Sequence, residues 1–130
     1  MRAVFFRAER KKVVLQVELS RFRVLEGKTG KVDEWLAFLN EHMEDVLLTL
    51  DGEKMYVETI FREVWQGVEY LYWYSVRGEG GTEVEESESY IDKRHLEYWD
   101  ECIDPDFGCV DLSTQVVMIP HRIRQAMENE

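Results

Sequence analysis

Two histidines stand at positions where they could exchange protons with a bound molecule. His95 lies in IDKRHLEYWDEC (91–102), a stretch whose apolar residues recur at helical spacing, and His42 lies in WLAFLNEHM (35–43). Burial and neighbouring carboxylates shift the pKa of an imidazole, which is how a general acid or base is made. We expect both rings to approach one cavity as candidate catalytic groups. Alternatively, each is a core or rim histidine with satisfied hydrogen bonds.

A glutamate and two arginines extend this set of candidate residues. Glu58, the third candidate catalytic group, alternates with Tyr56 and Ile60 in a strand-like run, where a carboxylate must pair or be hydrated. Arg21 and Arg23 are two positions apart and share one face of a predicted strand. They could clamp a carboxylate or another anion on a ligand. The alternative is an arginine–Glu58 pair across the sheet.

Aromatic side chains could line a pocket for a flat or sugar-like ligand. From this set we assign ligand binding to Tyr72 and Trp99; the alternative is that the aromatic residues only build the core and a dimer interface. The turn 104–106 holds two aspartates but lacks the further ligands of a calcium loop. Cys102 and Cys109 are too few for a zinc site or a disulfide framework. We therefore expect free thiols, no metal site and no cofactor.

The elements that must position these residues follow from periodicity and turn signals. Alternation predicts strands, a 3.6-residue apolar spacing predicts helices, and glycine or proline clusters separate them. The second helix has a capping-box pattern, Thr82 with Glu85, at its start. In chain order we predict a strand (12–24), a helix (32–50), a hairpin (54–65 and 69–76) turning at Gln66-Gly67, a helix (82–103), a turn (104–108) and a last strand (113–119).

This order, β-α-β-β-α-β, predicts an α+β protein of the ferredoxin-like plan, with two helices on one face of an antiparallel sheet. The strand 69–76 has apolar or aromatic residues on both faces, and the helices can cover only one of them. A second copy packed face to face would cover the other. We therefore expect a homodimer, a dimeric α/β barrel.

Length and composition bound the remaining possibilities. The 130 residues fit one domain, 1–130, with a core at about 12–120 and peripheral segments 1–11 and 121–130. No run is long enough for a membrane span, and the apolar start is too short for a signal peptide, so we expect a cytoplasmic protein that does not bind membranes. The net charge of −11 argues against nucleic acid as a partner, although residues 1–31 are basic.

Whole words of the sequence resemble a family of small bacterial proteins of unknown function. They include ELSRFRV (18–24), GEKMYVETIFRE (52–63) and LYWYSVRGEGG (71–81). The resemblance covers roughly residues 13–125 and implies the dimeric α/β-barrel architecture, without an assigned active site. More distant relatives of that architecture include cofactor-free monooxygenases, haem-degrading enzymes, chlorite dismutase-like proteins and rhamnose mutarotase. The last third is similar to the mutarotase, but the proline of the mutarotase's first-helix pattern is missing here.

The sequence names no specific reaction, and two functions from different classes remain open. One is a small-molecule enzyme or binding protein with a pocket between the sheet and the helices, in which His95 donates or accepts a proton. The other is a structural or stress-related homodimer without catalysis. Mutarotase-like or cofactor-free monooxygenase-like activity is a further alternative that the resemblance implies.

Overall fold

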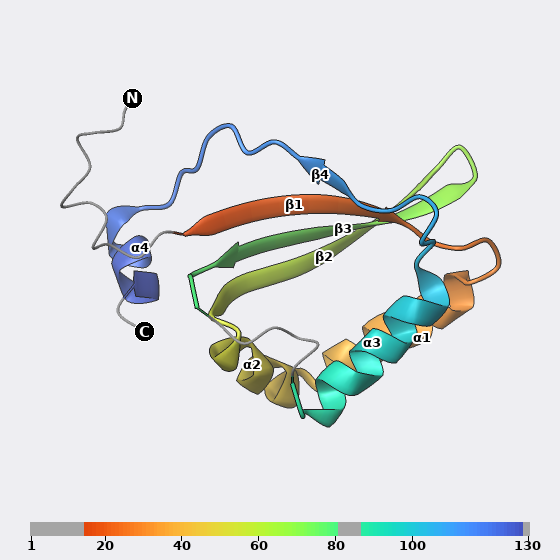
Figure 1. Ribbon diagram of the computed structural model, residues 1–130, viewed down its shortest axis with the longest axis horizontal. Coiled ribbons are helices and arrows are strands. Elements are labelled where there is room, and N and C mark those ends of the chain that lie inside the picture. The colour runs from red at the N-terminus through yellow and green to blue at the C-terminus, as the bar shows by residue number, and fades with distance from the viewer. Residues whose placement is uncertain (1–14, 81–86, 129–130) are drawn as a thin grey trace.

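The computed structural model describes residues 15–80 and 87–128, which form four strands and four helices (Figure 1). The architecture is α+β, with all strand pairings antiparallel in one sheet of order β2-β3-β1-β4. In chain order the elements are β1 (Gln16–Arg23), α1 (Thr29–Glu41), α2 (Met43–Gly52), β2 (Met55–Trp65), β3 (Val68–Arg77), α3 (Tyr90–Cys102), β4 (Val110–Leu112) and α4 (His121–Glu128).

Three helices, rather than the expected two, lie on one face of the sheet (Figure 1). The predicted helix 32–50 is divided at His42, which has φ −109° and ψ 31° and whose ring Nδ1 donates to the carbonyl of Phe38 at 2.9 Å. This backbone conformation ends α1, and α2 starts in a new direction. α4 occupies the predicted polar tail and lies apart from the other three helices (Figure 1).

The hairpin prediction is confirmed in detail. β2 and β3 are joined by Gln66 and Gly67 alone, with φ values of 53° and 77°. Two successive residues with positive φ match the right-handed twist of the paired strands, and the first pair of the hairpin is Trp65 with Val68. The hairpin register places Ile60 opposite Trp73 and so fixes which side chains face the helices.

Within the described residues, 87–89 are not helical as predicted, and the strand predicted at 113–119 is wrong. α3 begins at Tyr90, because the hydroxyl of Ser89 accepts from the backbone N–H of Ile91 at 3.2 Å and caps it. The proposed Thr82–Glu85 capping box lies outside the described residues. The last strand is β4, and the chain from 113 to 120 has no regular structure. There the hydroxyl of Thr114 donates to the carbonyl of Val17 at 2.7 Å, in place of a backbone ladder.

The core lies between the sheet and the pair α1–α3, and it is built largely from aromatic rings. Trp35 is fully buried and stacks on Tyr98 at 6.1 Å between ring centroids, while Phe22 and Trp99 meet edge to face at 4.6 Å. Large rings in such contacts bury much apolar area and fix the spacing between helix and sheet. The cluster of buried residues is completed by Val24, Val32, Leu71, Cys102 and Ile103.

Candidate functional site: a cavity between the sheet and the helices

A cavity of about 460 Å³ opens between the sheet and the helical layer, on the α2 side of the aromatic core. Its volume lies in the usual range for small-molecule sites. Met43 and Leu47 of α2 line it and are 40% and 52% exposed, so the cavity reaches solvent along α2. The other apolar lining residues are Leu36, Leu39, Val46, Leu50, Met55, Ile60, Trp73 and Ile91, and the polar ones are Asn40, Thr49, Glu53, Glu58, Thr59, Arg77, Asp92 and His95.

Asp92 is the buried acid of this cavity. It lies in the first turn of α3 and is only 5% exposed. Its Oδ2 atom is buried and has no hydrogen-bond partner among the residues that the structure describes. The positive end of the α3 dipole favours a carboxylate at this position, but it leaves this oxygen without a donor. Buried polar atoms are nearly always paired, so Asp92, which lines the cavity, lacks a donor that a ligand could supply.

Glu58 lines the cavity from the sheet side. The indole N–H of Trp73 on β3 donates to Oε2 of Glu58 at 2.5 Å and fixes the carboxyl group across the hairpin. Burial raises the pKa of Glu58 above its usual value; the bond from Trp73 opposes this, and the nearby charge of Asp92 adds to it. Glu58 therefore retains its proton to higher pH than an exposed glutamate does, which suits a proton donor.

His95 stands one helical turn after Asp92 and also lines the cavity. The indole N–H of Trp35 donates to Nδ1 of His95 at 3.1 Å, so the neutral ring carries its proton on Nε2. Burial lowers the pKa of His95, and the charge of Asp92 partly opposes this. Protonation would also place a second donor against the Trp35 N–H, so the neutral ring is favoured.

The structure places the predicted catalytic residues in two groups. His95 and Glu58 come together at the cavity, whereas His42 is not among its lining residues. His42 is held instead at the junction of α1 and α2, where its ring lies 4.5 Å from that of Phe38. The expectation that both imidazoles approach one cavity is therefore wrong.

Among the predicted ligand-binding residues, Trp99 is part of the aromatic core and does not line the cavity. Tyr72 is on the opposite face of the sheet, where its hydroxyl donates to Glu63 at 2.6 Å. The residues predicted for ligand binding thus contribute nothing to the wall of this cavity. Trp99 and Tyr72 therefore stay candidate ligand-binding residues only outside this cavity.

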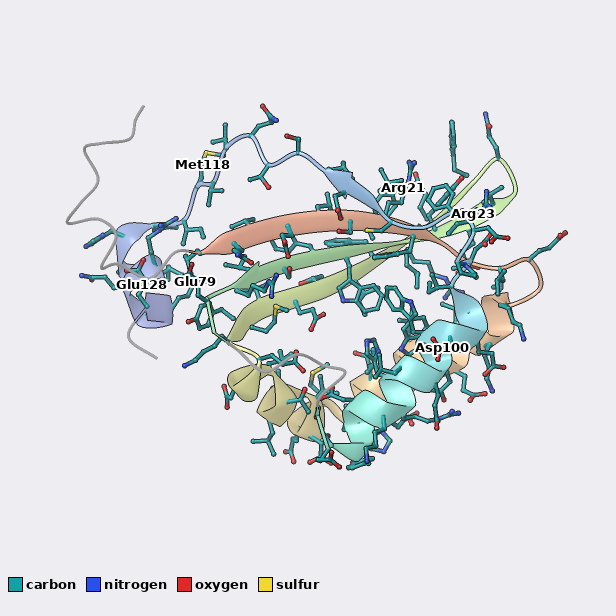
Figure 2. The ribbon with its side chains drawn as sticks, viewed as in Figure 1. Arg21, Arg23, Glu79, Asp100, Met118 and Glu128 are labelled. Atoms are coloured by element: carbon teal, nitrogen blue, oxygen red, sulfur yellow. The ribbon has the colours of Figure 1, made fainter. Side chains whose placement is uncertain are left out.

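The two arginines also lie outside the cavity, near the end of β1 and across the sheet from Asp100 of α3 (Figure 2). Both guanidinium groups approach the ring of Phe107, at 5.7 Å for Arg21 and 4.8 Å for Arg23. Arg23 forms an ion pair of 2.7 Å with Asp104. The alternative arginine–Glu58 pair across the sheet is therefore not formed, because these side chains lie on opposite faces.

Sequence reasoning missed Asp92. Its neighbours Lys93 and Arg94 are charged, which made this turn of α3 resemble a solvated face. The available signal was its spacing of three residues before His95, which places both side chains on one side of a helix. The depth at which Asp92 is buried depends on how α3 is rotated against the sheet.

Two further observations concern the described residues as a whole. Within 15–80 and 87–128, no three histidine, cysteine or acidic side chains are grouped so that they could hold a metal ion. No helix in the same ranges has the length and apolar character to cross a membrane. Cys102 is buried and Cys109 exposed, and both are free thiols, as the sequence predicted.

The fold and the cavity define the class of the protein. It is an α+β protein with a four-stranded antiparallel sheet, and the helices on one face of the sheet leave a cavity lined by apolar and acidic residues. Residues 15–125 match the model of a family described as "family of unknown function (DUF6176)". The chain therefore belongs to this family, and the resemblance to an uncharacterised family is confirmed. A comparison with curated proteins found no match.

Proposed function

We propose that this chain binds a small molecule in the cavity between sheet and helices and can exchange a proton with it. One observation carries the proposal: Asp92, a buried acid whose Oδ2 has no partner among the described residues, belongs to the lining of a cavity of ligand size. A bound molecule with a hydrogen-bond donor would satisfy that oxygen.

The pKa values of the neighbouring groups are shifted in opposite directions, and only Glu58 is ready to transfer a proton. Glu58, whose pKa is raised by burial, supports donation of a proton to the ligand. His95, whose pKa is lowered by burial, supports acceptance through its second ring nitrogen only after the tautomer changes, since Nδ1 already accepts from Trp35. We therefore propose that Glu58 donates a proton to the ligand and that Asp92 positions the ligand. His95 donates a hydrogen bond to the ligand from its Nε2 atom. This chemistry requires no cofactor.

A pair of matched variants on α2 tests whether the cavity is the binding site. Leu50 lines the cavity, whereas Leu48 on the same helix is 69% exposed and does not. We expect melting-temperature screens with sugars, carboxylates, amines and aromatic compounds to find stabilising compounds for the native chain and for Leu48→Phe. Leu50→Phe should reduce that stabilisation, because the larger side chain narrows the cavity and alters the wall that a ligand would contact. Failure of every class to stabilise the native chain, or equal stabilisation of Leu50→Phe, would contradict the proposal.

We also propose that two copies associate through the sheet face opposite the helices, in the ferredoxin-like, dimeric α/β-barrel arrangement. The strand order β2-β3-β1-β4, with β1 and β3 central, supports that plan. Leu19, Phe61, Tyr72 and Tyr74 line an open depression of about 330 Å³ on this face, and Phe61 is 56% exposed. Apolar surface of this kind is typical of an interface, and a second copy presents a matching one.

Light scattering separates this arrangement from a monomer. We expect twice the chain mass of 15.5 kDa for the native protein and for Leu48→Glu on the helical side. Phe61→Glu should give the mass of a single chain, because two carboxylates would then meet across the apolar depression. If the native protein is a monomer at micromolar concentration, the dimer is excluded, and the proposal that the cavity binds a small molecule is unaffected.

A further inference from the structure

The charges around the cavity select among possible ligands. Its charged lining residues are Glu53, Glu58, Asp92 and Arg77. Arg77 already has an acidic partner, since its Nε lies 3.5 Å from a carboxylate oxygen of Glu18 on β1. The acids thus outnumber the single cation of the described lining, and an anionic ligand would be repelled.

Buried Asp92 and partly buried Glu58 lie close enough to interact, and they come from opposite walls of the cavity. Asp92 belongs to α3 and Glu58 to β2, and the charge of Asp92 is felt at Glu58. Two carboxylates that share a site repel each other, and a cation bound between them would relieve that repulsion. His95 does not supply that cation, because the Trp35 bond and its burial favour the neutral ring.

The rest of the wall is apolar, with one aromatic ring beside the acids. Trp73 lines the cavity and is tied to Glu58 through its indole N–H, so its ring lies next to the carboxyl group. The aliphatic residues of α1 and α2 offer contacts for a hydrocarbon body.

We propose that the cavity binds an organic cation, a protonated amine on an apolar body, with its ammonium group against Asp92 and Glu58 and its body against α1 and α2. This inference rests on the proposed small-molecule site and names its ligand class. An ammonium group supplies the donor that Asp92 Oδ2 lacks among the described residues and offsets its buried charge. Neutral alcohols supply the donor but not the charge, and carboxylates supply neither.

Three compounds of nearly equal shape test the charge requirement: cyclohexylmethylamine, cyclohexylmethanol and cyclohexanecarboxylate. We expect calorimetric titration at neutral pH to show the amine binding at least about tenfold more tightly than the alcohol, and no binding of the carboxylate. Equal binding of amine and alcohol, or preference for the carboxylate, would overturn the cation inference and leave the small-molecule site intact. Binding of none of the three would count against both.

Two aspartates of α3 provide the matched variants. Asp92→Asn should abolish the preference for the amine while leaving the alcohol bound, because the amide keeps the shape but removes the charge. Asp100 lies on α3 outside the cavity, so Asp100→Asn should keep the full preference (Figure 2). Glu58→Gln offers a second route should Asp92→Asn not fold, and it should also reduce the preference. An undiminished preference in both cavity variants would overturn the inference.

Discussion

The two ends of the helical layer are packed by different rules. At one end, α1 and α3 meet the sheet through large rings, and Val32, Trp35 and Cys102 are completely buried. At the other end, α2 has no buried residue, although it is rich in leucine. The first end has the dense packing of a protein interior, and the second leaves a cavity of about 460 Å³. The packed core and the proposed binding site thus lie in separate halves of one layer.

The largest expected effect comes from emptying the packed end. Trp35→Ala should lower the free energy of unfolding by about 3–5 kcal/mol, because it leaves a void among rings that cannot collapse onto it. Leu48→Ala at the loose end should change it by less than about 0.5 kcal/mol. Urea unfolding of the two variants and the native chain measures the contrast. Similar losses at the two ends would show that α2 is packed as firmly as α1.

His95 stands at the boundary between the two ends and should have an intermediate effect. His95→Leu leaves the buried N–H of Trp35 without an acceptor, at a cost of about 1–3 kcal/mol, whereas His95→Gln retains an acceptor oxygen. We expect the glutamine variant to be the more stable of the two in urea. If His95→Leu is more stable than the native chain, the hydrogen bond from Trp35 does not contribute to stability and His95 acts only through packing.

The same residue predicts a pH dependence. Because the folded state lowers the pKa of His95, its contribution to stability is complete above the unfolded value of about 6.5 and is lost as the pH falls below it. This part of the acid-induced loss should be absent in His95→Gln. Unfolding curves of both chains between pH 5 and 8 should therefore diverge on the acid side.

The smallest effect is expected from Glu58, and it has the opposite sign. The folded state raises the pKa of Glu58, so its contribution is complete below the unfolded value and is lost as the pH rises through the folded one. Glu58→Gln should therefore raise stability at pH 7, by on the order of 1 kcal/mol, and less at pH 4. Chemical unfolding at the two values tests this. A variant that is less stable at pH 7 would mean that Glu58 has a compensating partner.

The parts of the fold that depend on local chemistry could be predicted from the sequence. Gln66-Gly67 specifies the hairpin because a two-residue turn needs two positive φ angles there. The strand predicted at 113–119 failed because its alternation had no buried side: Val116 is 71% exposed and Met118 85%. β1 pairs with the C-terminal part of the chain over only three residues, Leu19 to Arg21. So short a pairing depends on how the whole sheet assembles, and the local sequence does not predict it.

The candidate site could be predicted only in part, for a similar reason. His95 and Glu58 were identifiable as polar groups on otherwise apolar faces. Asp92 was not, because its charged neighbours Lys93 and Arg94 make this turn resemble a solvated helix face. Its burial arises from the rotation of α3, which is set by the contact of Tyr98 with Trp35. Long-range packing of this kind leaves no local pattern in the sequence.

The packed end also gives the molecule an optical property. The rings of Trp35, Trp73 and Trp99 lie 5.3–6.0 Å apart from centroid to centroid. Indole transitions at such separations couple, so the circular dichroism of these rings depends on their mutual orientation as well as on their surroundings. Trp73 belongs to this trio and also to the wall of the cavity. Occupation of the cavity should therefore be visible as a change in the coupled aromatic signal, with no label attached to the chain.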